Sequence, residues 1–220
     1  MLPADRTLQE MAGKLRDAQR RIERLETLEA PTLTAGLVCL ETIQVVAEVA
    51  SVTFSAIDQN FLHLWLWIIS KTPAVAGACA NRMTFNGDTG SNYKFLNKYH
   101  TRTGVVDTEV VTGGTGLTTD LVLGSLAGNP DWAACEVNIL NYALLNATPT
   151  RRTIIWKSWR HDTPGGEISP FVTLEHGGGE WINTTAPITS IIISAGGGTC
   201  KFAVGSLLSL MGVCAIGEPL

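Results

Sequence analysis

A regular heptad pattern fills the first 30 residues and ends at Pro31, and this change of pattern constrains the fold more than any single motif does. The a positions of the heptad are Leu8, Leu15 and Ile22, and the d positions are Met11, Ala18 and Leu25. Such spacing keeps one narrow apolar seam facing partner helices. Because the residue before a proline disfavours the helical conformation, we expect a coiled coil over residues 1–30 and a second domain over residues 31–220.

Charged residues beside the seam predict the oligomeric state. Arg21 falls at g and Glu26 at the following e, so the two can pair between neighbouring helices of a parallel, in-register bundle. The string RIERLE (21–26) is similar to the short trimerisation motif of three-stranded coiled coils, and leucine at a disfavours a simple dimer. We therefore expect a homotrimer. The alternative is an amphipathic helix lying on its own domain, but such a helix normally buries a wider stripe.

The remainder of the chain is poor in charge. The first 30 of 220 residues hold six of the 16 Lys and Arg residues and six of the 20 Asp and Glu residues. Globular proteins carry about a quarter charged residues, and the body carries about half that fraction. Either other subunits cover much of its surface or it has a large core, and both interpretations stay open here.

Several classes of function are disfavoured by composition. The formal net charge is −4 and no basic patch stands out, so we expect no direct binding to nucleic acid. The N-terminus is charged and has no apolar stretch typical of a signal peptide. The apolar runs at 61–69 and 207–216 are too short to cross a bilayer. We expect a soluble protein that is made in a cytoplasm and does not enter membranes.

Beyond Pro31 the pattern is that of strands separated by Gly, Pro, Asn and Asp turns. Residues 62–69 are apolar on both faces, which predicts a central strand covered by a second sheet and also by a neighbouring subunit. Residues 93–99 are ambiguous between a strand and a short helix. The other predicted strands are 36–49, 52–57, 83–85, 105–111, 117–123, 135–140, 153–159, 170–174, 180–183, 188–193 and 206–213. This pattern predicts a mainly β fold, a single β-sandwich of the jelly-roll kind, preceded by the coiled coil.

Cysteine spacing argues against a zinc site, because no CxxC pair is present. The five cysteines are Cys39, Cys79, Cys135, Cys200 and Cys214. One interpretation is five buried, reduced thiols; the other is oxidation after assembly, in which an odd count leaves at least one without an internal partner. Cys200 and Cys214 flank a predicted hairpin, so they are the best candidates for a local disulfide.

No segment carries a pattern typical of catalysis. The loop GDTGS (87–91) lacks the Gly-Lys-Ser/Thr ending of a phosphate loop, and with Asn86 it supplies too few carboxylates for calcium. His161-Asp162 and Glu175-His176 lie near Gly or Pro, which predicts exposed loops rather than an acid/base pair or a metal site. We expect no enzyme activity, no cofactor and no bound metal.

Three tryptophans are the candidates for surface recognition. Trp156, Trp159 and Trp181 lie in the arginine-rich part of the chain around Arg151 and Arg152. If their rings are exposed, they can stack on sugars and recognise a host glycan. The alternative is that they pack in the core or at a trimer interface.

Several segments together resemble a group of tailed-bacteriophage virion proteins that carry a jelly-roll domain, often behind an N-terminal coiled coil. The segments are TFSAI (53–57), LHL (62–64), FNGDTGSNY (85–93), VNILNY (137–142), APITSI (186–191) and FAVGSLLSLMGV (202–213). They span nearly all of residues 50–214. Such proteins often end in Leu-Tyr-Gly, and Met211 replaces the tyrosine here.

The resemblance implies a homotrimeric structural component of a virion. The partners it implies are further copies of the chain and the major capsid protein or another virion protein. We expect a capsid decoration or head-fibre protein. The alternatives are a tail or collar fibre that recognises a host-surface glycan, and a free-standing trimeric lectin-like module.

Overall fold

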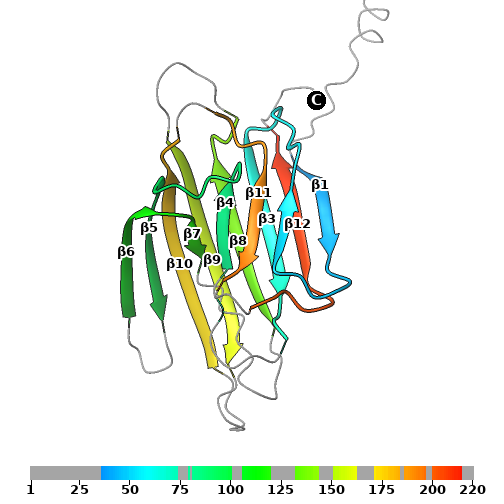
Figure 1. Cartoon of the computed structure of the whole chain (residues 1–220), viewed down its shortest axis with the longest axis vertical. Coiled ribbons are helices and arrows are strands. Elements are labelled where there is room, and N and C mark those ends of the chain that lie inside the picture. Colours follow the sequence, from blue (N-terminus) through cyan, green and yellow to red (C-terminus); the bar gives the residue numbers. More distant parts are fainter. Residues whose placement is uncertain are drawn as a thin grey trace, which may run out of the picture. The chain divides into compact units, whose positions relative to one another are not determined.

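The computed structural model describes residues 36–73, 79, 81–100, 106–119, 132–143, 151–162, 171–183, 186–196 and 200–214. These residues form twelve β-strands in two antiparallel sheets (Figure 1). In that part of the chain, no helix is long and apolar enough to span a membrane. The predicted coiled-coil positions, from Leu8 to Glu26, lie outside the described residues.

The two sheets differ in size. The larger has the strand order β1 (Leu37–Gln44), β12 (Leu207–Val213), β3 (His63–Ser70), β8 (Ala133–Leu140), β9 (Arg152–Asp162), β10 (Phe171–Trp181), β5 (Tyr93–His100) and β6 (Val106–Gly114). The smaller has the order β2 (Ser51–Phe54), β11 (Ile191–Ala195), β4 (Asn81–Phe85) and β7 (Leu117–Thr119). The prediction of a mainly β sandwich is confirmed.

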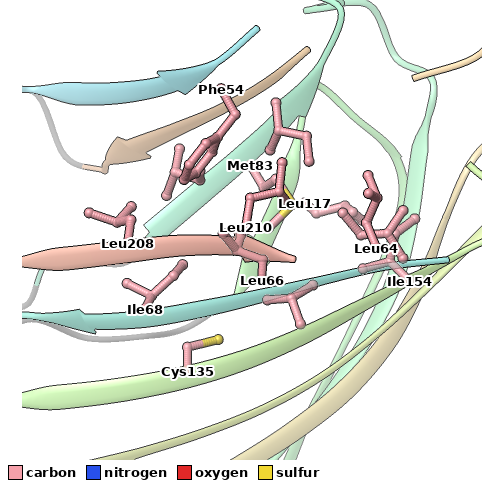
Figure 2. Packing of buried hydrophobic residues seen from close by; sticks show 14 of the residues in the cluster. Phe54, Leu64, Leu66, Ile68, Met83, Leu117, Cys135, Ile154, Leu208 and Leu210 are labelled. Atoms are coloured by element: carbon pink, nitrogen blue, oxygen red, sulfur yellow. The ribbon is translucent and has the colours of Figure 1, made fainter. Parts of the chain in front are cut away.

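An apolar core lies between the two sheets (Figure 2). Strand β3 shows how the sequence builds it, because Leu64, Leu66 and Ile68 point inward and are fully buried. From the smaller sheet, Phe54 and Met83 point toward them. Burying side chains of this size stabilises the fold by about 1.5–3 kcal/mol each, so the alternating pattern along β3 fixes its register in the sandwich.

Strand β10 corrects two sequence predictions. Segments 170–174 and 180–183 were expected as separate strands, but one strand runs through the glycines at 177–179. A Cβ at Gly177 would lie 2.3 Å from the Trp156 ring, and one at Gly179 would lie 2.8 Å from Leu117. Glycine therefore allows close packing of a continuous strand here. Residues 93–99, ambiguous in sequence, belong to strand β5.

The described chain enters and leaves the larger sheet at the same end. Leu37 of β1 lies opposite Val213 of β12, and the backbone N–H of Cys214 donates to the carbonyl of Gly36 at 3.2 Å. At the other end of β1, the N–H of Val45 donates to the carbonyl of Ser206 at 2.8 Å. The first and last described residues, Gly36 and Cys214, therefore lie at one end of the β1–β12 pair.

The disulfide joins a different pair from the one predicted. Cys79 is bonded to Cys200, with a Cα–Cα distance of 6.0 Å, whereas Cys39, Cys135 and Cys214 are free thiols. The predicted Cys200–Cys214 pair is wrong because the two cysteines flank opposite ends of β12. A seven-residue strand spans about 23 Å, while a disulfide requires Cα atoms within about 7 Å.

Candidate functional site

The outward face of the eight-stranded sheet is the candidate functional surface, because the smaller sheet packs on its other face. Strands β12, β3 and β8 each present alternate residues outward, and these are half-buried. They include Leu207, Met211, Val213, Trp65, Trp67, Ile69, Ala134 and Leu140. Among the outward residues of these three fully described strands, Glu136 alone carries a formal charge. We call this surface the charge-poor half.

Aromatic rings connect the charge-poor half to the neighbouring strand. Trp65 and Trp67 meet edge to face at 6.2 Å between ring centroids, and Trp67 meets Trp159 of β9 at 5.5 Å. Ala134, on the intervening strand β8, lies opposite Trp159 in register and is small enough to let the rings approach. The outward side of β3 is therefore as aromatic as its inward side is aliphatic, as residues 62–69 predicted.

The outward face changes character beyond β8. Lys157 of β9, His176 of β10 and Lys98 of β5 occupy matching register positions, and all three are exposed. We call these three residues the cationic row, after the two lysines that carry its formal charge at pH 7. Each lies in a different part of the sequence, so no sequence motif predicted that the three would be neighbours. The larger sheet thus presents a charge-poor surface on β12, β3 and β8, and beyond β8 a mixed surface in which lysines lie among exposed apolar side chains.

The three candidate tryptophans separate in the structure. Trp156 and Trp181 are 1% and 0% exposed because they occupy inward positions of β9 and β10, so the alternative of core packing holds for these two candidates and they cannot contact a glycan. Trp156 packs near Phe95, and Trp181 packs near Phe85. Trp159 points outward and is 36% exposed. One tryptophan is therefore available for recognition, and two belong to the core.

The neighbouring arginines also have distinct roles. Arg151 forms a salt bridge with Glu180, with 2.9 Å between Nη1 and Oε2. Arg152 is buried and donates from Nη2 to the carbonyl of Ala186 at 3.0 Å, and burial lowers the pKa of Arg152 below its ordinary value. One arginine thus neutralises an outward carboxylate, while the other fastens the backbone near the start of β11.

The loop at 87–91 is a structural turn between β4 and β5. Burial raises the pKa of Asp88, but hydrogen bonds from Trp181, Asn92 and the Gly90 backbone more than offset this, so the pKa lies below its ordinary value. The carboxylate accepts from Trp181 Nε1 at 2.8 Å and from Asn92 at 2.9 Å. Asn86 accepts backbone N–H groups from Thr189 and Ser190. These hydrogen bonds therefore stabilise the turn and its contacts with other segments of the chain.

The titratable groups do not assemble into a catalytic or metal site within the described residues. No group of three or more His, Cys, Asp or Glu residues there could hold a metal ion. His176 lies inside β10 rather than in the loop expected from sequence, although its side chain is exposed as expected. Burial, together with nearby Glu175 and Glu136, raises the pKa of the Cys135 thiol. This buried thiol is a poor nucleophile.

Comparisons with known proteins do not assign a family. No family model matches the sequence, and no curated protein matches it. A crystal structure of a protein of unknown function from Shewanella oneidensis MR-1 is similar over 85% of this chain and 80% of that chain, with 11% identity and a TM-score of 0.24. A likeness at this level carries no argument about fold or function, so any proposal depends on the surfaces described above.

Proposed function

We propose that this chain is a homotrimeric structural protein of a bacteriophage virion, a capsid decoration or head-fibre protein attached to the particle surface. The observation that carries the assembly is the charge-poor half of the larger sheet. Protein interfaces are depleted in charge and enriched in tryptophan and methionine, and this surface presents Trp65, Trp67 and Met211. In the proposed trimer, neighbouring copies cover it.

The order of the strands supports the jelly-roll part of this proposal. If the β5–β6 and β9–β10 hairpins are set aside, the remaining sheets are β1-β12-β3-β8 and β2-β11-β4-β7. This is the order expected when a chain folds back through two Greek keys into a jelly roll. In this interpretation the hairpins are insertions that extend one sheet past β8.

The heptad pattern of residues 8–26 supports three as the number of copies. A short coiled coil is marginal by itself, so the trimer needs a second contact surface, and the charge-poor half is suited to that purpose. Three copies presenting equivalent surfaces bind a shell by summing weak contacts. The proposed partner is the major capsid protein or another virion protein.

A charge placed in the charge-poor half tests the assembly. Met211→Glu buries an unpaired carboxylate in the proposed interface, so we expect the dissociation constant of the trimer to rise at least about tenfold. Val110→Glu is the matched control, because Val110 is 67% exposed on β6 of the same sheet face. Sedimentation equilibrium of the full chain measures both. Equal constants for the two variants, or a monomeric parent protein, would contradict the proposal.

The position of the protein in the particle distinguishes the two virion roles. Imaging of whole particles should show many trimers spread over the head if the protein is a decoration. A few trimers at one vertex would instead indicate a collar or tail fibre that recognises a host glycan. The exposed Trp159 beside the cationic row favours that second role.

A further inference from the structure

Gly178 is the one residue of the β10 glycine triplet whose lack of a side chain the packing does not explain. A Cβ there would meet only the carbonyl oxygen of Ile154, at an ordinary 3.7 Å, whereas Gly177 and Gly179 leave no room for one. Glycine inside a strand loses more conformational entropy on folding and packs no side chain. Such a glycine often marks a place where a ligand approaches the backbone closely.

Gly178 leaves a local gap among the outward side chains of β10 and its two neighbouring strands. Gly178 lies between Ile155 of β9 and Leu96 of β5 in register, and these two side chains are 44% and 49% exposed. The missing side chain leaves a floor of bare backbone between two apolar walls. We call this surface the Gly178 groove.

The cationic row crosses the Gly178 groove one outward position along β10. His176 lies in the groove, with Lys157 on one side and Lys98 on the other. Adjacent strands are about 4.8 Å apart, so the Cα atoms of Lys157 and Lys98 lie about 10 Å apart. Their ammonium groups can therefore reach the same ligand. The surface combines a backbone floor and apolar walls at Gly178 with a lysine on each side of His176.

Acidic residues near the groove do not cancel the positive charge of the cationic row. Glu180, the next outward residue of β10 on the other side of Gly178, is paired with Arg151 at 2.9 Å. Glu136 lies directly opposite Lys157 on β8 and keeps its negative charge while it accepts a hydrogen bond from Asn138 at 3.2 Å, but the two lysines of the cationic row outnumber it. The groove therefore favours a negatively charged ligand.

We propose that the Gly178 groove binds a linear acidic polysaccharide of a cell surface. One sugar ring lies over Gly178 between Ile155 and Leu96, and its acidic group pairs with Lys98 and Lys157 of the cationic row. The exposed face of Trp159, two residues along β9 from Lys157 and about 13 Å along the strands from Gly178, packs against the C–H face of a ring further along the same sugar chain. The inference extends the proposed function from assembly to recognition, and it does not depend on the oligomeric state.

The strand arrangement disfavours two other anionic partners. An acidic peptide that binds a sheet by strand addition needs an open edge, whereas β9, β10 and β5 are each paired on both sides. Single-stranded nucleic acid needs aromatic rings at successive positions. In the described outward positions of these three strands, Trp159 is the only aromatic ring besides the imidazole of His176. A sugar chain needs neither feature.

The test compares oligogalacturonate, a carboxylated sugar chain, with neutral dextran of equal length in titration calorimetry on the full-length protein. Gly178→Val fills the groove and keeps every charge, so we expect binding at least about tenfold weaker with a melting temperature equal to or above the parent's. The double variant Lys98→Gln/Lys157→Gln should weaken binding by a similar factor. Thr112→Val on β6 and Lys201→Gln are the matched controls and should bind as the parent does.

Several outcomes would overturn the proposal. These are no binding of oligogalacturonate by the parent, equally tight binding of dextran, or unchanged affinity in Gly178→Val. Tighter binding of polyglutamate or of a DNA oligonucleotide, lost in the same variants, would assign the groove to a peptide or nucleic acid instead. Sedimentation of Gly178→Val separates this result from the assembly proposal, because filling the groove should leave the trimer intact.

Discussion

Trp181 donates its indole N–H to the carboxylate of Asp88 at 2.8 Å, and this bond joins the end of β10 to the turn between β4 and β5. Because β10 belongs to the larger sheet and β4 to the smaller, the pair connects the two layers of the sandwich. The Phe85 ring packs on Trp181 at 5.6 Å between centroids. Interlayer contact here combines apolar packing with a charge-assisted hydrogen bond.

The Asp88 interaction predicts a loss of stability in acid. The folded pKa of Asp88 lies below its ordinary 3.8, so its contribution is complete above about pH 4 and disappears as the pH falls through the folded pKa. Hydrogen bonds to charged groups contribute about 1.5–3 kcal/mol. Urea unfolding at pH 6 and pH 3 should show a smaller acid-induced loss in Asp88→Asn than in the parent. An identical loss in both would contradict this role.

Tyr93 predicts the opposite dependence at high pH. Its hydroxyl donates to the carbonyl of Asp88 and accepts from the N–H of Phe85, both at 2.9 Å. Burial, with a contribution from the Asp88 charge, raises the pKa of Tyr93 from 10.0 to about 12. Its stabilising contribution is therefore complete below pH 10 and is lost as the pH rises toward 12.

Replacing Tyr93 tests that alkaline dependence. Tyr93→Phe should lower the free energy of unfolding by about 1–3 kcal/mol at pH 7, because a buried N–H and a carbonyl lose their partner. The variant should also lose less additional stability than the parent between pH 9 and pH 11. Unfolding in urea at the three pH values measures both effects, and a parallel decline in the two proteins would argue against Tyr93 as the titrating group.

Adjacent glycines of β10 should respond differently to the same substitution. Gly177→Ala places a Cβ 2.3 Å from the Trp156 ring, and overpacking of this kind costs about 1–3 kcal/mol or more. Gly178→Ala meets no clash and should be neutral or stabilising by about 0.5–1 kcal/mol. Thermal melting of the two variants gives the comparison directly. Equal melting temperatures would show that the Trp156 contact is not as close as described.

The Cys79–Cys200 disulfide predicts redox-dependent stability. It closes a loop across a sequence separation of 121, and the chain-entropy model gives a stabilisation of about 3–5 kcal/mol for loops of this size. Reductant should lower the urea midpoint of the parent protein, whereas Cys79→Ser should be insensitive to it. Cys214→Ser, the control, should keep the parent's response. Peptide mapping that linked Cys200 to Cys214 would refute the pairing.

The sequence predicted most of the strands because the residue pattern of a strand depends only on that segment of the chain. Residues 62–69 and 135–140 predicted β3 and β8 to within two residues, the first from a continuous apolar run and the second from alternation of apolar and polar residues. The same reasoning failed along β10. Glycine is required at position 177 because the Trp156 ring, on another strand, leaves no room for a side chain. Periodicity within the segment therefore could not predict a continuous strand.

The candidate surfaces were less predictable, because register between distant strands determines them. The low number of charged residues after Pro31 suggested that part of the surface is covered. In the structure, the outward residues of β12, β3 and β8 form such a charge-poor surface. The cationic row combines residues 98, 157 and 176, which become neighbours only through strand pairing. Trp156 and Trp159 differ by three positions, so they face opposite sides of one strand; fixing which side faces the core requires the sheet itself.

The adjacent entry and exit of the chain at Leu37 and Val213 have a mechanical consequence. A load applied between the two flanking segments would peel β1 from β12 one hydrogen bond at a time, which resists little force. A load applied between the entry point and Trp132, at the start of β8 near the opposite end of the sheet, would instead shear many bonds at once. A sandwich held at Leu37 and pulled at Trp132 would therefore withstand far more tension than one pulled at Leu37 and Val213.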